Sequence, residues 1–381
     1  MFKKIKNWFT KLLHRQSFQH NPDYTLIGVI SIILVYGLIM LSSATSAVAY
    51  ANHGDSYYFF KHQLFGIAIG LVLFYFLSRI DYHIWKKYAA GFLFFSIALL
   101  LLVFIPHLGA HYGKAPRWIN VLGFSLQPSE FVKISFLLYL AAWLESRKSK
   151  LHEFNAGIKP FLTALGAIAI LMLMQPDLGT LSIIVITALS VYFVGGGKTK
   201  HIIYIILAGV IAMMILVRIK PYQADRFRCY ADPNYSPDDI CYQLNQSLIA
   251  VGSGGIWGRG LGASREKFMY LPEVSGDSIF PIIGEETGFI FSVGLILLFL
   301  LLFYRGYKIS KNAPDHFGRN LAIGIVTWIV AQALINIGSM IDAMPMTGVP
   351  LPFISYGGTA MMSALSAIGV LVNISKHTKI N

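Results

Sequence analysis

The chain has 381 residues, of which 55 % are hydrophobic and only 13 % are charged, and its mean hydropathy is +0.60. A soluble domain usually carries about 25 % charged residues, so this composition excludes an ordinary soluble globular protein. The formal net charge of +13 would suit a nucleic-acid partner, but the distribution of the basic residues gives it a different meaning.

The chain begins with an alternation of apolar and basic residues on a helical period. Residues 2–15 read FKKIKNWFTKLLHR, with an apolar stripe on one face and lysines on the others. This pattern predicts an amphipathic helix within residues 1–22 that lies on an anionic leaflet. The apolar stretch that follows is long and has no clear small-residue cleavage site, which argues against a cleavable signal peptide.

Runs of apolar residues long enough to span a hydrocarbon core about 30 Å thick recur along the chain. They predict an all-α integral membrane protein with about ten transmembrane helices. Residues 23–375 would form one polytopic membrane domain, residues 219–280 a large extracytoplasmic loop within it, and residues 376–381 a cytoplasmic tail. The expected spans are 24–46, 59–79, 88–106, 127–145, 160–175, 178–195, 200–218, 281–304, 319–341 and 354–374.

The basic residues gather in alternate connections between these spans. If the N-terminus is cytoplasmic, 20 of the 31 lysines and arginines fall in cytoplasmic segments. The positive-inside rule then predicts a multi-pass plasma-membrane protein with both termini in the cytoplasm. The basic excess is an orientation signal under this interpretation, so we expect no nucleic-acid partner.

Two charged residues fall inside the fourth expected span, in the motif QPSEFVK. Charged groups at membrane depth are costly, so they tend to be functional or paired. Glu130 and Lys133 are three residues apart, so they share a helix face and can pair. A neutralising ion pair and a direct substrate contact are both compatible with this pattern.

Two aspartates stand at expected span ends. Asp177, in QPDLGT, follows a proline break, and a helix N-cap is its favoured interpretation. Asp277, in YLPEVSGDSIF, could also be an N-cap, although Ser278 could do that as well. A carboxylate at a wet membrane edge is also where a general base would act on a sugar hydroxyl, and the sequence leaves both options open.

Three further segments attract attention. In the motif GEETG we expect one of Glu285 and Glu286 to point into the bundle and the other to lie at the interface. Residues 344–358, with three prolines and three glycines, predict an irregular loop, which at membrane depth must be buried in protein or line a cavity. The glycine-rich stretch 252–262 lacks the context of a nucleotide site and favours tight turns.

Cys229 and Cys241 are the only cysteines, and the expected topology puts both outside the cell, where disulfides persist. The segment between them is polar and turn-rich, so it has no apolar face with which to order itself. We therefore expect a disulfide between them, with two unpaired thiols as the alternative.

Eight motifs in series resemble the SEDS family (shape, elongation, division and sporulation), whose members are polytopic peptidoglycan glycosyltransferases that polymerise lipid II. The resemblance covers residues 24–375 and is closer to the division member than to the elongation member. One departure is the V-S-G that precedes Asp277. The motifs are APRWI, QPSEFVK, QPDLGT, YQLNQS, GxWGxGLG, YLPExxxDSIF, IGEExG and PLPFISYGG.

The resemblance implies that Asp277 is the essential aspartate and that Glu130 and Lys133 are an intramembrane pair. It also implies positions around the substrate cavity for Arg117, Gln243, Gln246, Ser247, Glu285 and Ser355. The implied reaction is an inverting glycosyl transfer from a glycan on polyprenyl pyrophosphate to the 4-hydroxyl of the lipid II N-acetylglucosamine. Asp277 suits the base. Lys133, Arg117 and Arg226 suit the departing pyrophosphate, a task that a divalent cation (Mg²⁺ or Mn²⁺) could share.

The resemblance also implies partners, namely lipid II, a class B penicillin-binding protein that supplies transpeptidation, and other division or elongation membrane proteins. Three alternatives remain open. One is an elongation-type polymerase, another is a lipid II flippase, which needs an occluded path near the midplane, and the third is a noncatalytic division scaffold.

Overall fold

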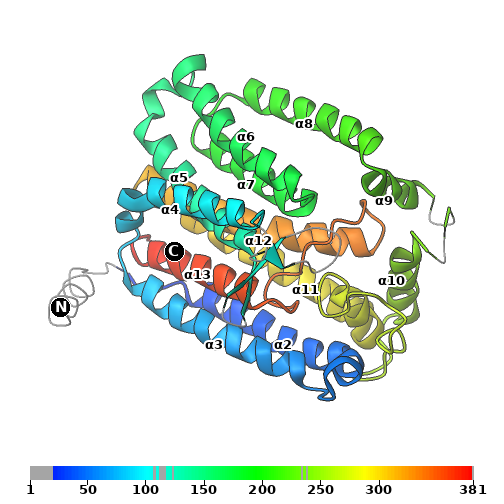
Figure 1. Ribbon diagram of the computed structural model, residues 1–381. Helices are drawn as coiled ribbons and strands as arrows, with labels where there is room; N and C mark the ends of the chain where they lie inside the picture. Colours follow the sequence, from blue (N-terminus) through cyan, green and yellow to red (C-terminus); the bar gives the residue numbers. More distant parts are fainter. Residues whose placement is uncertain are drawn as a thin grey trace.

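A computed structural model describes residues 20–105, 109–110, 117–121, 124–232, 235–236 and 239–379. The amphipathic helix expected over residues 2–15 lies outside this described part. The first described residues sit beside the other end of the chain, because the backbone N–H of His20 donates to the carbonyl of Lys376, 3.1 Å away. The first and last described residues therefore lie at one end of the molecule, here called the terminal end (Figure 1).

Ten long helices of the described chain account for the ten expected spans, with boundaries that differ by up to seven residues. Eight helical segments of the described chain are long and apolar enough to cross a membrane, and α7 is a shorter apolar helix. The protein is thus an all-α membrane protein. The helices are α2 (Tyr24–His53), α3 (Tyr58–Arg79), α4 (His83–Leu102), α5 (Pro128–Ser146), α6 (Lys159–Met174), α7 (Leu178–Val194), α8 (Thr199–Ile219), α11 (Ile279–Lys311), α12 (His316–Met340) and α13 (Gly358–Lys376).

The centre of the bundle is formed by α12 and α13, most of whose residues are buried, whereas α8 has no buried residue and runs at the margin (Figure 1). A helix that is apolar on all sides belongs in the interior. Small residues let its neighbours approach closely. At Gly324 of α12, a Cβ atom would lie only 2.1 Å from Leu137 Cδ1 on α5, so a larger residue here would force the Leu137 side chain to move.

Side-chain caps fix several helix ends. Asp23 caps α2 by accepting from Leu26 N (3.0 Å), and it also pairs with Arg305 of α11 (2.7 Å). Asp177 accepts from Thr180 N (3.1 Å) at the start of α7. The N-cap interpretation of Asp177 is therefore confirmed.

Some elements were not expected from the sequence. Strands β1 (Gly109–Ala110), β2 (Trp118–Val121) and β3 (Phe124–Leu126) form a small antiparallel sheet in that order between α4 and α5. Two short helices, α9 (Pro221–Ala231) and α10 (Tyr242–Ser253), give order to the large loop at the other end of the bundle, here called the loop end. Short turns η1 (Lys148–Lys150) and η2 (Phe154–Ile158) precede α6.

The glycine-rich stretch after α10 forms tight turns, as expected, and the backbone packs directly on α11. A Cβ at Gly254 would lie 2.0 Å from the carbonyl oxygen of Gly284. Gly258 has φ +80° and fits against the carbonyl of Glu286. Opposite Gly258, α11 itself is broken at Gly288, where φ is +75°. Glycine is needed here because two backbones touch.

We expect Gly254→Ala to lower the thermal unfolding temperature of the purified protein, because overpacking against backbone costs about 1–3 kcal/mol. The matched control is Gly252→Ala, since a Cβ at Gly252 meets nothing within 4 Å. Thermal unfolding in detergent measures both variants. Equal melting temperatures for the two would show that the stretch does not dock as described.

Candidate functional site

Asp277 stands at the loop end, in the turn that leads into α11. The N-cap residue of α11 is Ser278, and its side chain makes no capping hydrogen bond. The Asp277 carboxylate accepts a long hydrogen bond from Gln243 Nε2 on α10 (3.4 Å), and the same nitrogen donates to Ser278 Oγ (2.8 Å). Asp277 thus faces α10 instead of capping its own helix, so the carboxylate is not committed to helix structure.

The backbone around Asp277 is tied to α12 and to the 341–357 loop. Asn336 Nδ2 donates to the carbonyl of Asp277 (2.7 Å) and to the carbonyl of Val349 (2.8 Å). The N–H of Tyr356 donates to the carbonyl of Ser275 (2.8 Å). Asn336 Oδ1 is among the buried atoms of the described chain that have no hydrogen-bond partner. The turn is held rigidly, and one acceptor beside it is left for another donor.

A positive charge lies close to the Asp277 carboxylate. A Cβ built on Gly348 would lie 3.4 Å from Arg226 Nη2 and 3.6 Å from Asp277 Oδ2, so both side chains reach the same small residue. Gly348 has φ +70° and leaves room for them. Arg226 extends from α9, where its Nη2 also donates to Tyr222 Oη (2.6 Å). Segments from α9, α10, α12 and the 341–357 loop therefore converge on Asp277.

The surroundings of Asp277 set its protonation. Burial raises the pKa of the carboxyl to about 6, and the negative charge of Glu273 acts in the same direction. Arg226 and the hydrogen bond from Gln243 oppose this rise in pKa. A carboxyl with a pKa near 6 is ionised at neutral pH yet basic enough to take a proton from a substrate hydroxyl.

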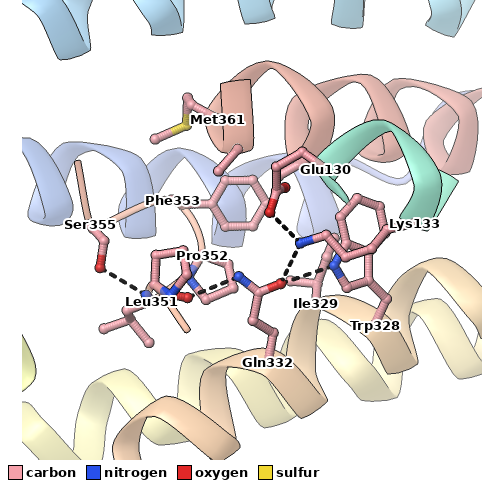
Figure 2. Close-up of a pocket in the computed structure, with 13 residues that line it drawn as sticks. Glu130, Lys133, Trp328, Ile329, Gln332, Leu351, Pro352, Phe353, Ser355 and Met361 are labelled. Carbon is pink, nitrogen blue, oxygen red and sulfur yellow. Dashed lines mark hydrogen bonds and ion pairs between the residues drawn. The ribbon is translucent and has the colours of Figure 1, made fainter. Parts of the chain in front are cut away.

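Deeper in the bundle, Glu130 and Lys133 of α5 form the ion pair that their spacing allows (Figure 2). Lys133 Nζ lies 2.7 Å from Glu130 Oε1, and both side chains are 3 % exposed. The ammonium also donates to Gln332 Oε1 (2.9 Å) and lies 4.8 Å from the ring centre of Trp328. The buried charge is thus neutralised and hydrogen-bonded, as a charge in a membrane interior must be.

Gln332 of α12 connects this pair to the loop. Its Oε1 accepts from Lys133 and from Trp328 Nε1 (3.0 Å), while its Nε2 donates to the carbonyl of Pro350 (2.9 Å) (Figure 2). Ser355 lines the same cavity, and its Oγ accepts from Leu351 N (2.8 Å). The cavity holds about 20 Å³, which is room for one water molecule.

Two residues of α12 connect Asp277 with the buried Glu130–Lys133 pair. Gln332 and Asn336 are four residues apart on α12, so they lie on one face about one helical turn apart. They hold the adjacent carbonyls of Pro350 and Val349. The buried pair and the turn that carries Asp277 are therefore linked by hydrogen bonds through α12 and the loop.

The remaining expected site residues lie at the connection between α6 and α7, on α10 and on α11. Arg117 donates to the carbonyls of Gln175 and Pro176, at the connection between α6 and α7. Ser247 of α10 is buried and donates to the carbonyl of Gln243 (2.7 Å). Gln246 is half-buried on the same helix, three residues after Gln243 and so on the same face.

Glu285 and Glu286 are both buried, with 1 % of each exposed, so the expectation that one of them lies at the interface is wrong. Glu285 accepts from Ser264 Oγ (2.6 Å) and pairs with Arg259 (3.2 Å). Glu286 pairs with buried Lys267 (2.9 Å). Both carboxylates are needed inside because each anchors the loop 259–267, which leads to the Asp277 turn.

Sequence reasoning missed Trp328, Gln332 and Asn336, which organise the site from α12. A signal was present, because two amide side chains four residues apart in an apolar span share one face and need partners.

For a divalent cation, the described residues contain no group of three or more His, Cys, Asp or Glu side chains. A divalent cation would therefore need oxygen ligands from outside such a group, such as backbone carbonyls, water or substrate.

We expect Lys133→Ala and Glu130→Ala each to cost about 3–5 kcal/mol of stability, because either leaves a buried charge without its partner. The double variant should lose less than the sum of the two. Lys61→Ala is the control, since the side chain of Lys61 is 65 % exposed in its pair with Asp55, and it should leave the melting temperature unchanged. Strict additivity in a thermal-unfolding cycle would contradict the coupling.

Comparison with known proteins agrees with this architecture. Residues 24–380 match the FtsW/RodA/SpoVE family model, described as cell cycle protein. The chain is 38 % identical over 359 residues to stage V sporulation protein E of Bacillus subtilis, which covers 94 % of this chain and 98 % of that protein. It is 36 % identical over 357 residues to the probable peptidoglycan glycosyltransferase FtsW of Geobacter sp. strain M18, with 94 % and 97 % covered.

A solved structure of a peptidoglycan synthase complex that coordinates polymerization and crosslinking contains a chain with the same fold. Its TM-score is 0.76 at 24 % identity, with 93 % of this chain and 97 % of that chain covered. Fold, motifs and relatives agree, and the chain belongs to the FtsW/RodA/SpoVE family, which is the SEDS family that its motifs resemble.

Proposed function

We propose that this protein is a peptidoglycan glycosyltransferase that polymerises lipid II into glycan strands at the outer face of the bacterial plasma membrane. The observation that carries the proposal is Asp277, a half-buried carboxyl with a pKa of about 6, beside Arg226 at the loop end of a membrane bundle. Relatives named as probable peptidoglycan glycosyltransferases over nearly the whole chain support the same reaction.

In this reaction Asp277 takes the proton from the 4-hydroxyl of the lipid II N-acetylglucosamine. The resulting oxygen attacks the anomeric carbon of the glycan chain with inversion, and the polyprenyl pyrophosphate departs. Arg226 offsets the negative charge that grows on the leaving group. Gln243 and Asn336 keep the Asp277 turn in the geometry that proton transfer needs. Both lipid tails stay in the bilayer, which suits a site among transmembrane helices.

The other cations act as positioning groups. The ammonium of Lys133 is already engaged by Glu130 and Gln332. It therefore fixes Gln332, which in turn holds the 349–355 loop in place. The Nε and Nη2 atoms of Arg117 hold the 175–176 carbonyls. A Mg²⁺ or Mn²⁺ ion would have pyrophosphate oxygens and water as its ligands, and would supply further charge neutralisation at the leaving group.

The proposed orientation puts the loop end outside the cell and both termini in the cytoplasm. The distribution of lysines and arginines supports this orientation through the positive-inside rule. The partners follow from the chemistry: lipid II as substrate, a class B penicillin-binding protein that crosslinks the product, and other division membrane proteins. The solved relative that coordinates polymerization and crosslinking supports such a pairing.

The role we favour is septal synthesis during cell division, because many of the similar proteins are named FtsW. An elongation role or a sporulation role would use the same chemistry. The similarity to stage V sporulation protein E supports the sporulation role as an alternative. The rival activity is lipid II flipping. It would run past the buried pair, where the cavity of this structure, about 20 Å³, is smaller than a disaccharide.

Asp277→Asn should lower the polymerisation rate by about 10²–10⁴-fold, because the amide cannot act as a base. Lipid II binding and the melting temperature should stay close to wild type. The matched control is Glu273→Gln, which removes a neighbouring exposed carboxylate and should leave most of the activity. Substantial polymer from Asp277→Asn would remove Asp277 from the mechanism.

The polymerisation rate should fall as pH drops through about 6, because Asp277 must be ionised to act and its pKa is raised to about 6. The acid limb of kcat/KM against pH, measured with purified protein and lipid II, reports this value. A rate that stays constant down to pH values near the ordinary Asp value of about 3.9 would contradict the assignment.

The orientation predicts opposite labelling of two exposed positions by a membrane-impermeant thiol reagent in intact cells. Ala263→Cys at the loop end should react, and Asn312→Cys at the terminal end should react only after lysis. Both positions are exposed, so protection by packing does not confuse the result. Labelling of Asn312→Cys in intact cells would show that the proposed orientation is wrong.

A further inference from the structure

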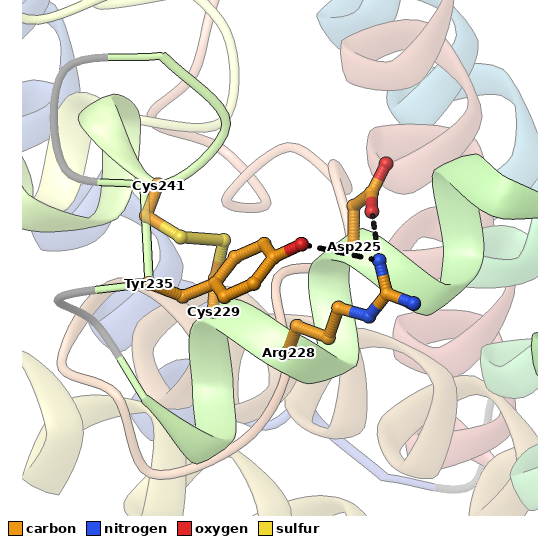
Figure 3. The surroundings of a disulfide bond; sticks show 5 residues. All are labelled: Asp225, Arg228, Cys229, Tyr235 and Cys241. Carbon is orange, nitrogen blue, oxygen red and sulfur yellow. Dashed lines mark hydrogen bonds and ion pairs between the residues drawn. A yellow bond between two sulfur atoms is a disulfide. The ribbon is translucent and has the colours of Figure 1, made fainter.

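A disulfide joins the two short helices that carry the neighbours of Asp277. Cys229 of α9 and Cys241, the N-cap residue of α10, are bonded, and their Cα atoms are 5.4 Å apart (Figure 3). Both residues are buried, with 3 % and 0 % exposed. The bond therefore fixes the end of α9 against the start of α10.

Within the described residues, few other buried contacts hold α9 in place. It continues from α8, which has no buried residue, and the only buried residues of α9 itself are Gln223 and Cys229. The disulfide forms a small apolar cluster of its own with Leu244, Leu248 and Met346. By contrast, α10 packs on α11 and α12 through several buried side chains. The disulfide is thus the main attachment of a poorly packed helix to a well-packed one.

Each half of the disulfide lies next to a group that reaches Asp277. Arg226 precedes Cys229 by three residues, so the two share a face of α9. Gln243 follows Cys241 by two residues and contacts the carboxylate directly. Met346 of the cluster lies two residues before Gly348, where an added Cβ would meet both Arg226 and Asp277. A link between the two helices therefore sets the distance between Arg226 and the carboxylate.

We propose that Cys229 and Cys241 are positioning residues, whose bond holds Arg226 against Asp277 and Gln243. The bond restricts the loop that it closes and removes the alternative placements of α9. Without it, α9 would be tethered mainly through α8, and the guanidinium would spend most of its time away from the carboxylate. The expected effect on polymerisation rests on the proposed function, whereas the effect on α9 does not.

Amide hydrogen exchange tests the structural half of the proposal. In the double variant Cys229→Ala/Cys241→Ala, exchange in α9 should accelerate by about tenfold or more, because the helix opens locally. Exchange in α10 should stay within about twofold of wild type, since its packing on α11 and α12 remains. Unchanged exchange in α9 would overturn the proposal, and so would equal acceleration of α9 and α10, which indicates general loosening.

The pH profile of polymerisation tests the functional half. The charged neighbours of Asp277 are Glu273, which raises its pKa, and Arg226, which lowers it. Loss of the bond should therefore move the acid limb to higher pH, as Arg226→Gln should. Combining the three substitutions should give no further shift, because the bond acts through Arg226.

The matched control for this profile is Arg228→Gln. Arg228 is exposed on the same helix and contacts Asp225 and Tyr235 (Figure 3), so its loss should leave the acid limb in place. Additive shifts from the disulfide variant and Arg226→Gln would overturn the positioning role. If the wild-type protein makes no polymer, the proposed function fails, and the exchange of α9 against α10 still decides the role of the disulfide.

Discussion

The two ends of the Gln332 side chain connect the buried ion pair of α5 to the 341–357 loop. In the membrane interior, a lysine ammonium persists only if a carboxylate and further acceptors satisfy it. Gln332 completes that set for Lys133, and with its other end it holds the carbonyl of Pro350. One turn further along α12, Asn336 holds the carbonyls of Val349 and Asp277. The buried charge and the turn that carries the Asp277 carboxylate are therefore parts of one hydrogen-bonded frame.

The rest of the loop end is held to the same frame by independent ties. Glu285 and Glu286 bring the 259–267 loop onto α11 through buried ion pairs, and the disulfide brings α9 onto α10. The loops at this end are long, and a long loop loses much conformational entropy when it orders. Ion pairs, backbone contacts at glycine and one covalent bond together supply the order that apolar packing alone does not give.

The sequence predicts the membrane helices well because a span of about 20 apolar residues has few other stable forms. It also predicts the pairing of Glu130 with Lys133, since helical spacing alone brings them together. The sequence does not predict the features that depend on contacts between distant parts of the chain. The strands at 109–126 are too short to show a period, and the burial of Glu286 depends on Lys267 from a distant loop. The position of Arg226 beside Asp277 depends on the disulfide that ties α9 to α10 and on the close approach of Gly348 in the 341–357 loop, which no local pattern records.

The central claim is that chemistry, rather than transport, takes place at the loop end. The most direct test uses proteoliposomes that carry the purified protein, with lipid II supplied only to the leaflet at the loop end. Our account predicts that glycan polymer forms from this lipid II without its transfer to the other leaflet, alone or with the cognate penicillin-binding protein. Movement of lipid II between leaflets with no polymer under either condition would contradict it.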